Sequence, residues 1–201
     1  MDSKEQDYRM LPEYVQIDDV SSKNRDVLRT HAEEIQFPLS DEDKAIVDQL
    51  VFKFSNEQNC AGLAAPQIGY GKRIVVFHVS EDAKSLRKDV YETVPPIVLV
   101  NPQYHPVGSD KTIDWEGCFS VKLTMGEVPR YTTIAYQGYD TSGNKVEGIA
   151  KGFLARLIQH EVGHLNGELF IDLITKGCRS GPVEEMRAVR IKEREASIAK
   201  P

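Results

Sequence analysis

No stretch of this sequence stays apolar for long enough to cross a membrane, and cysteine is scarce. A transmembrane helix needs about 20 consecutive apolar residues, so we expect no membrane contact. The three cysteines, Cys60, Cys118 and Cys178, are odd in number and widely spaced. This spacing argues against a disulfide framework and favours a reducing, cytoplasmic location. Residues 1–7 are polar, mix both charges and lack the apolar core of a signal peptide.

A surplus of positive charge is also missing. The chain has 25 lysines and arginines against 31 aspartates and glutamates, a net charge of −6. A protein that follows the phosphates of DNA carries a basic surplus, so the composition argues against direct DNA binding. The length of 201 residues is enough for one hydrophobic core. We predict a polar N-terminal arm over residues 1–20 and a single domain over residues 21–201.

Hydrophobic periodicity predicts both helices and strands. A capping serine, an acidic first turn and apolar residues at helical spacing indicate a helix from Ser40 to about Gln58. A second helix should follow residue 152, and residues 183–197 should form a third. Strands are expected at 73–79, 97–102, 127–139 and 145–149, with a charged loop at 80–93 and a hairpin turn at 140–144. We therefore predict an α+β fold, in which mixed or antiparallel sheets pack around a central helix and a C-terminal helix follows.

The pentapeptide His160-Glu161-Val162-Gly163-His164 carries the sharpest chemical signal. Histidines four residues apart lie on the same face of a helix, so both rings can bind one metal ion. Glu161 lies about 100° further around the helix, where its carboxylate can reach a metal-bound water as a general base. A surface helix with two ordinary histidines is the alternative. The apolar residues at 153–158 favour a buried helix instead, where such groups are costly without a metal or partner.

Two histidines leave a metal site incomplete, because catalytic zinc sites usually take three protein ligands and keep one position for water. His31, His78 and His105 are candidates for the third ligand. Cys118 is another candidate, since a thiolate is a strong ligand for zinc and ferrous iron. Taken alone, such a cysteine is more often a small buried hydrophobic residue. The residues by themselves leave this choice open.

Two segments upstream of the histidine motif stand out together with it. Residues 62–67 read Gly-Leu-Ala-Ala-Pro-Gln, residues 116–120 read Glu-Gly-Cys-Phe-Ser, and residues 159–164 read Gln-His-Glu-Val-Gly-His. In this order they resemble the peptide deformylase family, which is marked by Gly-x-Gly-Leu-Ala-Ala-x-Gln, Glu-Gly-Cys-Leu-Ser and Gln-His-Glu-x-Asp-His. The similarity extends from about residue 20 to 175, and it identifies the single domain as peptide deformylase-like.

This resemblance implies a hydrolase that removes the N-formyl group from N-formylmethionyl peptides and releases formate. Cys118, His160 and His164 would hold one divalent metal ion, which is ferrous iron in many family members, with zinc or nickel as substitutes. The metal and Glu161 would activate water for attack on the formyl carbon. Glu161 would then deliver the proton to the leaving amine.

The resemblance also implies roles for residues that bind the substrate. The side-chain amide of Gln67 and the backbone N–H of Phe119 would stabilise the oxyanion, and each such donor can be worth roughly 3 kcal/mol. The backbone around Gly62 would pair with the extended peptide as an added strand. Phe119, Phe153 and Leu157 would face the methionine pocket.

Structural support and partners follow from the same resemblance. Arg130 matches a family arginine that pairs with the glutamate at Glu116. Nascent N-formylmethionyl peptides would be the substrates. In this family a C-terminal helix can dock on the ribosome, which makes the ribosome a candidate partner for residues 183–197.

Departures from the family pattern motivate two rival functions. Cys60 replaces the first glycine of the loop, and Gly163 replaces the aspartate between the histidines. These changes indicate a divergent member and raise a non-catalytic peptide- or metal-binding protein as one rival. The other rival is a zinc metalloprotease with a downstream ligand such as Glu184 or Glu185. That reading leaves both upstream segments unexplained, and a pure binding role leaves Glu161 unexplained.

Overall fold

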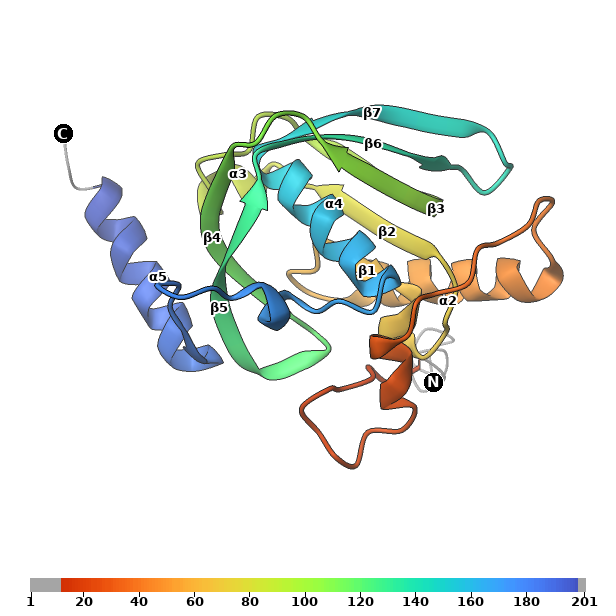
Figure 1. Ribbon diagram of the computed structural model, residues 1–201, viewed down its shortest axis with the longest axis horizontal. Helices are drawn as coiled ribbons and strands as arrows, with labels where there is room; N and C mark the ends of the chain where they lie inside the picture. The colour runs from red at the N-terminus through yellow and green to blue at the C-terminus, as the bar shows by residue number, and fades with distance from the viewer. Residues whose placement is uncertain (1–11, 199–201) are drawn as a thin grey trace, which may run out of the picture.

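The computed structural model describes residues 12–198 as the α+β fold that the sequence predicts. Two antiparallel sheets lie around one helix, α4 (Gly152–Leu165) (Figure 1). The helix packs against strands of both sheets, so its side chains are held from two sides. The larger sheet has the order β1 (Gly62–Ala64), β2 (Ile74–Val79), β3 (Val94–Pro106), β6 (Thr133–Tyr139) and β7 (Lys145–Lys151), and the smaller one has the order β4 (Lys111–Cys118), β5 (Val121–Tyr131) and β8 (Ser180–Pro182).

The helix α4 is a core element because its sequence is apolar on nearly every face. Residues 153–159 and 161–165 are all buried. Gly152 begins the helix at φ 56°, and a Cβ there would overlap the carbonyl oxygen of Asp89. The helix ends before Gly167, which adopts φ 73°, a left-handed conformation that glycine commonly supplies just after a helix. A helix buried on all sides cannot slide or rotate freely, which fixes the position of the histidine motif.

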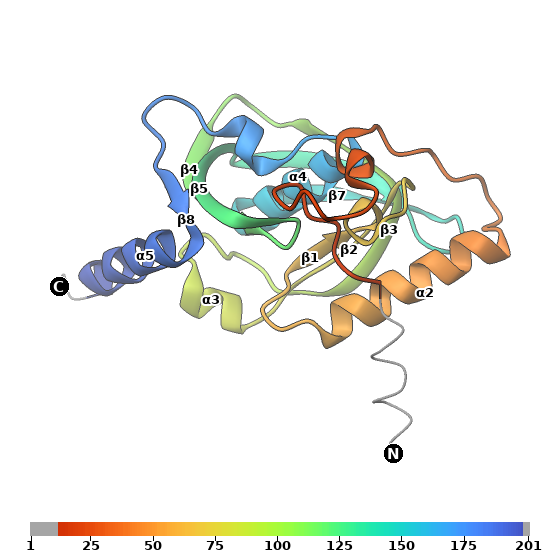
Figure 2. The same cartoon turned by 90° about the horizontal axis from the view of Figure 1, so that it is seen from below.

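The helix α2 (Asp41–Asn56) covers the other face of the larger sheet near β1 and β2 (Figure 2). Ser40 caps it as predicted, since its side chain accepts a hydrogen bond of 3.0 Å from the backbone N–H of Asp43. Ile46, Leu50 and Phe54 are buried at helical spacing. The helix ends two residues before the expected Gln58. Its buried side chains pack with residues of β1 and β2 in one hydrophobic cluster.

The predicted elements differ from the structure within residues 80–139. Residues 127–139 are not one strand: β5 ends at Tyr131 and β6 begins at Thr133, and the two belong to different sheets. Strand β4 was not predicted, because residues 111–113 are exposed and show no apolar alternation. The segment 80–93 contains a short helix, α3 (Asp82–Leu86), in place of a continuous loop.

The last described element is α5 (Val183–Ile198), which matches the helix predicted at residues 183–197 and lies at one side of the molecule (Figure 1). Arg179 links it to the smaller sheet: its guanidinium bonds to Glu127 and Glu193 and lies 4.9 Å from the centre of the Trp115 ring. No helix within residues 12–198 is long and apolar enough to cross a membrane.

Part of the arm expected at residues 1–20 is described from residue 12 onwards, whereas residues 1–11 lie outside the described residues. The backbone N–H of Val15 donates to the Gln67 carbonyl at 2.9 Å, and that of Ile17 donates to the Ser120 carbonyl at 2.9 Å. The segment therefore crosses two of the loops that carry predicted site residues. Within residues 12–198 the chain also forms three 3-10 helices: η1 (Arg25–Arg29), η2 (Ala65–Ile68) and η3 (Phe170–Leu173).

Candidate metal centre

The structure brings together the side chains of Cys118, His160 and His164. Their possible ligand atoms all lie within 4.8 Å of one another, and Cys118 Sγ is 3.3 Å from His164 Nε2. Cys118 ends β4 in the smaller sheet, whereas both histidines project from α4. Of the other third-ligand candidates, His78 hydrogen-bonds the Cys60 carbonyl at 3.0 Å, and neither His31 nor His105 belongs to the cluster.

A buried carboxylate sets the orientation of His160. Glu116, 5% exposed, receives a hydrogen bond of 2.8 Å from His160 Nδ1. Arg130 holds the same carboxylate with two bonds of 2.9 Å, the pairing that the family resemblance implied. With Nδ1 engaged in this way, the other ring nitrogen of His160 is left for a metal ion, which is how neighbouring carboxylates orient metal-binding histidines. One soft thiolate and two imidazoles form a ligand set that fits zinc, iron or nickel.

The two histidines of the cluster have pKa values shifted in opposite directions. Burial lowers the pKa of His160, but its hydrogen bonds to Cys118 and Glu116 outweigh burial and raise it to about 10. Burial and the neighbouring His160 hold the pKa of His164 well below its usual value. Burial raises the pKa of Glu116, yet Arg130 and His160 lower it far more. A divalent cation would therefore displace a proton from His160 and meet His164 already neutral.

Arg156 is a part of this network that sequence reasoning missed. It is 2% exposed and donates to Glu116 at 2.8 Å, to the Val128 carbonyl at 2.8 Å and to the Thr112 carbonyl at 2.8 Å. A signal was present, because this arginine interrupts an apolar stretch one helical turn before His160. Arg156 joins α4 to β4 and β5, and it neutralises the carboxylate that orients His160.

Glu161 is buried beside the cluster with one oxygen unbound. Its side chain is 3% exposed, and Oε2 has no hydrogen-bond partner among the described residues. Burial is the main cause that raises its pKa, to about 7. The backbone of β1 passes so close that a Cβ at Gly62 would lie 2.5 Å from Oε1. Glycine at position 62 therefore makes room for this carboxylate.

Gln67, in the short helix η2, and Phe119, in the turn after β4, both lie close to Cys118. The Gln67 side-chain oxygen accepts from the Ala64 N–H at 2.9 Å, which directs Nε2 to Cys118 Sγ at 3.4 Å. The Ser120 N–H also donates to that sulfur at 3.4 Å. The Phe119 carbonyl accepts a bond of 2.6 Å from Gln16, and its ring stacks on Tyr14 at 5.0 Å. The N-terminal segment thus contacts both loops that carry predicted oxyanion donors.

The residues expected at the methionine pocket fall into two groups. Phe153 and Leu157 lie one turn apart on α4 and are buried in the same hydrophobic cluster, where the Arg87 guanidinium lies 4.4 Å from the Phe153 ring centre. Phe119 packs instead against the cluster under α2. Gly62 lies on β1, at the edge of the larger sheet, where β2 is its one strand partner within residues 12–198.

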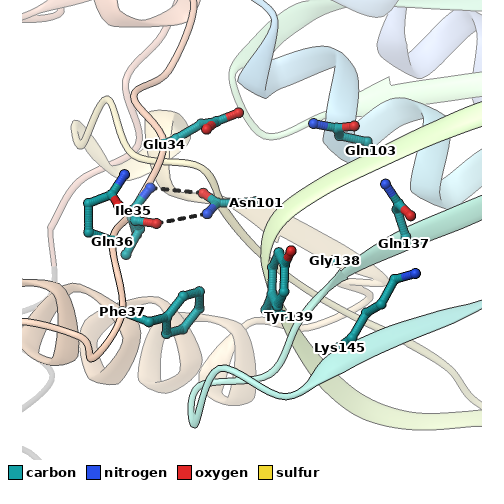
Figure 3. A pocket seen from close by; sticks show the side chains of 10 residues that line it. All are labelled: Glu34, Ile35, Gln36, Phe37, Asn101, Gln103, Gln137, Gly138, Tyr139 and Lys145. Carbon is teal, nitrogen blue, oxygen red and sulfur yellow. Dashed lines mark hydrogen bonds between the residues drawn. The ribbon is translucent and has the colours of Figure 1, made fainter.

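A separate hollow of about 300 Å³ lies between residues 34–37 and the strands β3, β6 and β7 (Figure 3). Polar side chains line much of it, including Gln103, Gln137 and Lys145. Asn101 closes one wall, because its amide bonds both backbone groups of Ile35. None of the lining residues belongs to the metal cluster, so this hollow is not the candidate site.

Two histidines, a cysteine and a buried glutamate define a candidate metal hydrolase centre, and comparisons with known proteins agree with this class. Residues 17–180 match a family model described as polypeptide deformylase. Peptide deformylase 2 of Rickettsia conorii is 48% identical over 168 residues, covering 82% of this chain and 83% of that protein. Peptide deformylase 1 of Nitrosomonas europaea is 46% identical over 112 residues, covering 56% of this chain and 62% of that protein.

Solved structures give the same result. A peptide deformylase from Ehrlichia chaffeensis superposes with a TM-score of 0.70 at 28% identity, covering 93% of this chain and 96% of that one. A class I type b peptide deformylase from Acinetobacter baumannii, bound to Met-Ala-Ser, gives a TM-score of 0.69 at 27% identity, covering 82% of this chain and 98% of that one. The chain belongs to the peptide deformylase family, whose members are metal-dependent hydrolases that remove N-formyl groups.

Proposed function

We propose that this protein hydrolyses the formyl amide of N-formylmethionyl peptides and releases formate. The observation that carries the proposal is the cluster of Cys118, His160 and His164 beside the buried, partly unbound carboxylate of Glu161. The family match over residues 17–180 supports the same reaction. The relative bound to Met-Ala-Ser, a deformylated form of such a peptide, supports the substrate class.

In this proposal Cys118, His160 and His164 hold one divalent ion. We propose ferrous iron as the native metal and zinc or nickel as substitutes, because a thiolate with two imidazoles suits all three. When bound, such an ion would polarise the formyl oxygen and lower the pKa of a water molecule. Glu116 and Arg130 would serve as structural support, since they orient His160 and take no part in proton transfer.

Glu161 has two proton transfers in the proposed reaction. Its carboxylate takes a proton from the attacking water, whose oxygen bonds to the formyl carbon. When the carbon–nitrogen bond breaks, Glu161 returns that proton to the nitrogen, which leaves as a free amine. A pKa of about 7 supports both steps, because a group that titrates near neutral pH can accept and release a proton there.

Gln67 and Phe119 would stabilise the negative charge that develops on the formyl oxygen. The Gln67 amide is 2% exposed and fixed through its own oxygen, so its N–H groups need no reorganisation during the reaction. The proposed second donor is the backbone N–H of Phe119, the residue that follows Cys118. Each donor acts on the oxyanion, so its loss should lower kcat more than it raises KM.

The substrate peptide would extend the larger sheet at β1. The free edge at Gly62 supports this arrangement, because an extended peptide can pair with an unpaired strand edge. Phe119, Phe153 and Leu157 would then contact the methionine side chain. Their apolar surfaces match a thioether chain, which packs well against aromatic and branched side chains.

The two rival functions gain no specific support. A metalloprotease needs a downstream ligand, yet Cys118 supplies a third ligand atom, and Glu184 and Glu185 lie on the terminal helix α5. A non-catalytic binding protein has no need for a buried glutamate with an elevated pKa at its metal site. The hydrolase therefore explains more of the site than either rival does.

The remaining proposals concern partners and location. We propose nascent formylated peptides as the substrates and α5, with its many charged and exposed residues, as the contact with the ribosome. No contact with DNA or with a membrane is part of this proposal. We propose the cytoplasm as the compartment, because the free thiols of Cys60, Cys118 and Cys178 suit a reducing environment.

The direct test is formate release from formyl-Met-Ala-Ser by protein prepared without oxygen. We expect turnover with iron, and replacement of Cys118 by alanine should remove both the metal and the activity. Cys178→Ala is the matched control, because this thiol lies outside the cluster. No turnover with iron, nickel, cobalt or zinc would overturn the proposal. Full metal content in Cys118→Ala would support the rival metalloprotease function.

A further inference from the structure

Gly163 leaves a gap on α4 that faces the carboxylate of Glu168. A Cβ at Gly163 would lie 3.4 Å from Glu168 Oε1 and 3.5 Å from its carbonyl oxygen. The turn after the helix produces this approach: Gly167 adopts φ 73°, and the Glu168 N–H donates to the Gly163 carbonyl at 2.9 Å. The carboxylate five residues further along the chain therefore lies beside the position where a side chain of residue 163 would begin.

Glu168 also joins the network that orients His160. Its Oε1 lies 3.8 Å from Arg130 Nη1, and Arg130 holds Glu116 with two further bonds. Glu116 in turn accepts the bond from His160 Nδ1. The path runs from Glu168 through Arg130 and Glu116 to the imidazole. Arg130 is 4% exposed at its side chain, whereas Glu168 is 40% exposed, so Glu168 is the solvent-facing end of the path.

We propose that Glu168 is a positioning residue for the metal centre and that it supplies, from the turn after α4, the acid that the family motif carries at position 163. This inference rests on the proposed function. The geometry accounts for the glycine at position 163. An aspartate at position 163 would bring a second carboxylate against Glu168, and two like charges in contact beside one arginine repel each other. Glycine at position 163 removes the aspartate carboxylate, so Glu168 alone pairs with Arg130 on this side.

The test combines three variants: Glu168→Ala, Gly163→Asp, and the two together. Glu168→Ala should weaken metal affinity and lower kcat by about tenfold, the lower end of what losing such a supporting residue costs. Gly163→Asp should be harmful in the natural background and beneficial in the Glu168→Ala background. A reversal of sign of this kind arises when two groups share one partner. Asp48→Ala, which removes an exposed acid on α2, is the control and should match the parent protein.

Metal affinity is measured by competition with a chelator on folded protein, alongside kcat and KM for formyl-Met-Ala-Ser. A merely structural role would lower the melting temperature without moving the metal affinity. If a variant fails to fold, Glu168→Gln keeps the size of the side chain and removes only the charge. Unchanged metal affinity in Glu168→Gln, or additive effects of the two substitutions, would overturn the proposal.

The two proposals fail separately. If the parent protein binds metal but releases no formate, the proposed function fails, and the metal measurements still decide the role of Glu168. If the parent protein is active and Glu168→Gln equals it in both affinity and kcat, the proposed function stands and the inference about Glu168 fails.

Discussion

Burying the charged form of the Glu161 carboxylate costs folding free energy. This cost applies only at a pH at which the carboxyl group is ionised. Its pKa is about 7 in the folded protein, against about 4.3 in an unfolded chain. The folded state therefore holds its proton more tightly than the unfolded state. As pH rises through this window, stability falls, and the loss is complete above about pH 7. A general base kept ready in a dry site is thus a source of instability in the metal-free protein.

We expect Glu161→Gln to make the metal-free protein more stable above pH 7 while abolishing formate release. Removing the buried charge should contribute about 3–4 kcal/mol at pH 8, or roughly 7–15 °C in melting temperature for a chain of this length. The gain should vanish near pH 4, where the native carboxyl is neutral as well. Thermal melts of both proteins from pH 4 to 8 measure the difference, and a difference independent of pH would contradict this explanation.

At the scale of residues, the candidate ligands and the general base were easier to predict than the buried residues that hold them in place. His160, Glu161 and Cys118 stand in short local patterns, which can be read without knowing the fold. Arg156 acts on Glu116 across 40 residues of sequence, and Glu168 reaches Arg130 through a turn that only Gly167 allows. Contacts made by folding leave no mark in local spacing, so Arg156 and Glu168 were missed, whereas the family resemblance had already implied the pairing of Glu116 with Arg130.

At the scale of elements, the segment Tyr14–Ile17 ties together parts of the site that come from distant regions. It bonds the Gln67 carbonyl, the Phe119 carbonyl and the Ser120 carbonyl, and Tyr14 reaches Glu57 beyond the end of α2 at 2.9 Å. Composition alone marked residues 1–20 as an arm, because polar sequence without periodicity resembles a solvated tail. Backbone hydrogen bonds hold this segment in place. Composition cannot reveal them, because any sequence can make such bonds.

We expect Gln16→Ala to lower kcat with little change in metal content. The amide of Gln16 holds the Phe119 carbonyl at 2.6 Å, and its loss should cost about 1 kcal/mol of stability. If the backbone of Phe119 shifts, its N–H, the proposed oxyanion donor, moves with it. A displacement of that N–H by as much as 1 Å would cost on the order of 100-fold in rate. Gln36→Ala, which removes an exposed glutamine from another part of the chain, is the control. Equal kcat in the two variants would show that the segment does not position Phe119.

Elements with clear periodicity were predicted, whereas those defined by their partners were not. The helices α2, α4 and α5 follow from apolar spacing and caps. The boundary at Thr132 does not, because β5 and β6 are continuous in sequence and separate only when each pairs with its own sheet. Strand β4 is held by pairing with β5 and by the bond of Arg156 to Thr112, and neither contact is visible in its own residues.

At the scale of the whole molecule, the metal centre joins the smaller sheet to α4, two parts that the hydrogen bonds of Arg156 and His160 to Glu116 also link. Cys118 comes from the smaller sheet, whereas His160 and His164 come from the helix between the sheets. A bound ion would therefore link β4 to α4, and it would bind the folded protein far better than the unfolded chain. Free energy of that kind adds directly to stability, by about 2.7 kcal/mol when the free metal is at 100 times its Kd.

Removing the metal should lower the melting temperature of the protein by roughly 5–10 °C, the shift that this free energy produces in a chain of this length. The measurement is a thermal melt before and after treatment with a chelator, followed by restoration of the metal. Cys118→Ser is the control, because its melting temperature should not respond to chelator or metal. If the parent protein responds no more than Cys118→Ser does, the cluster does not bind metal across the two parts. A response in the parent alone would show that the ion which serves the reaction also holds the smaller sheet against α4.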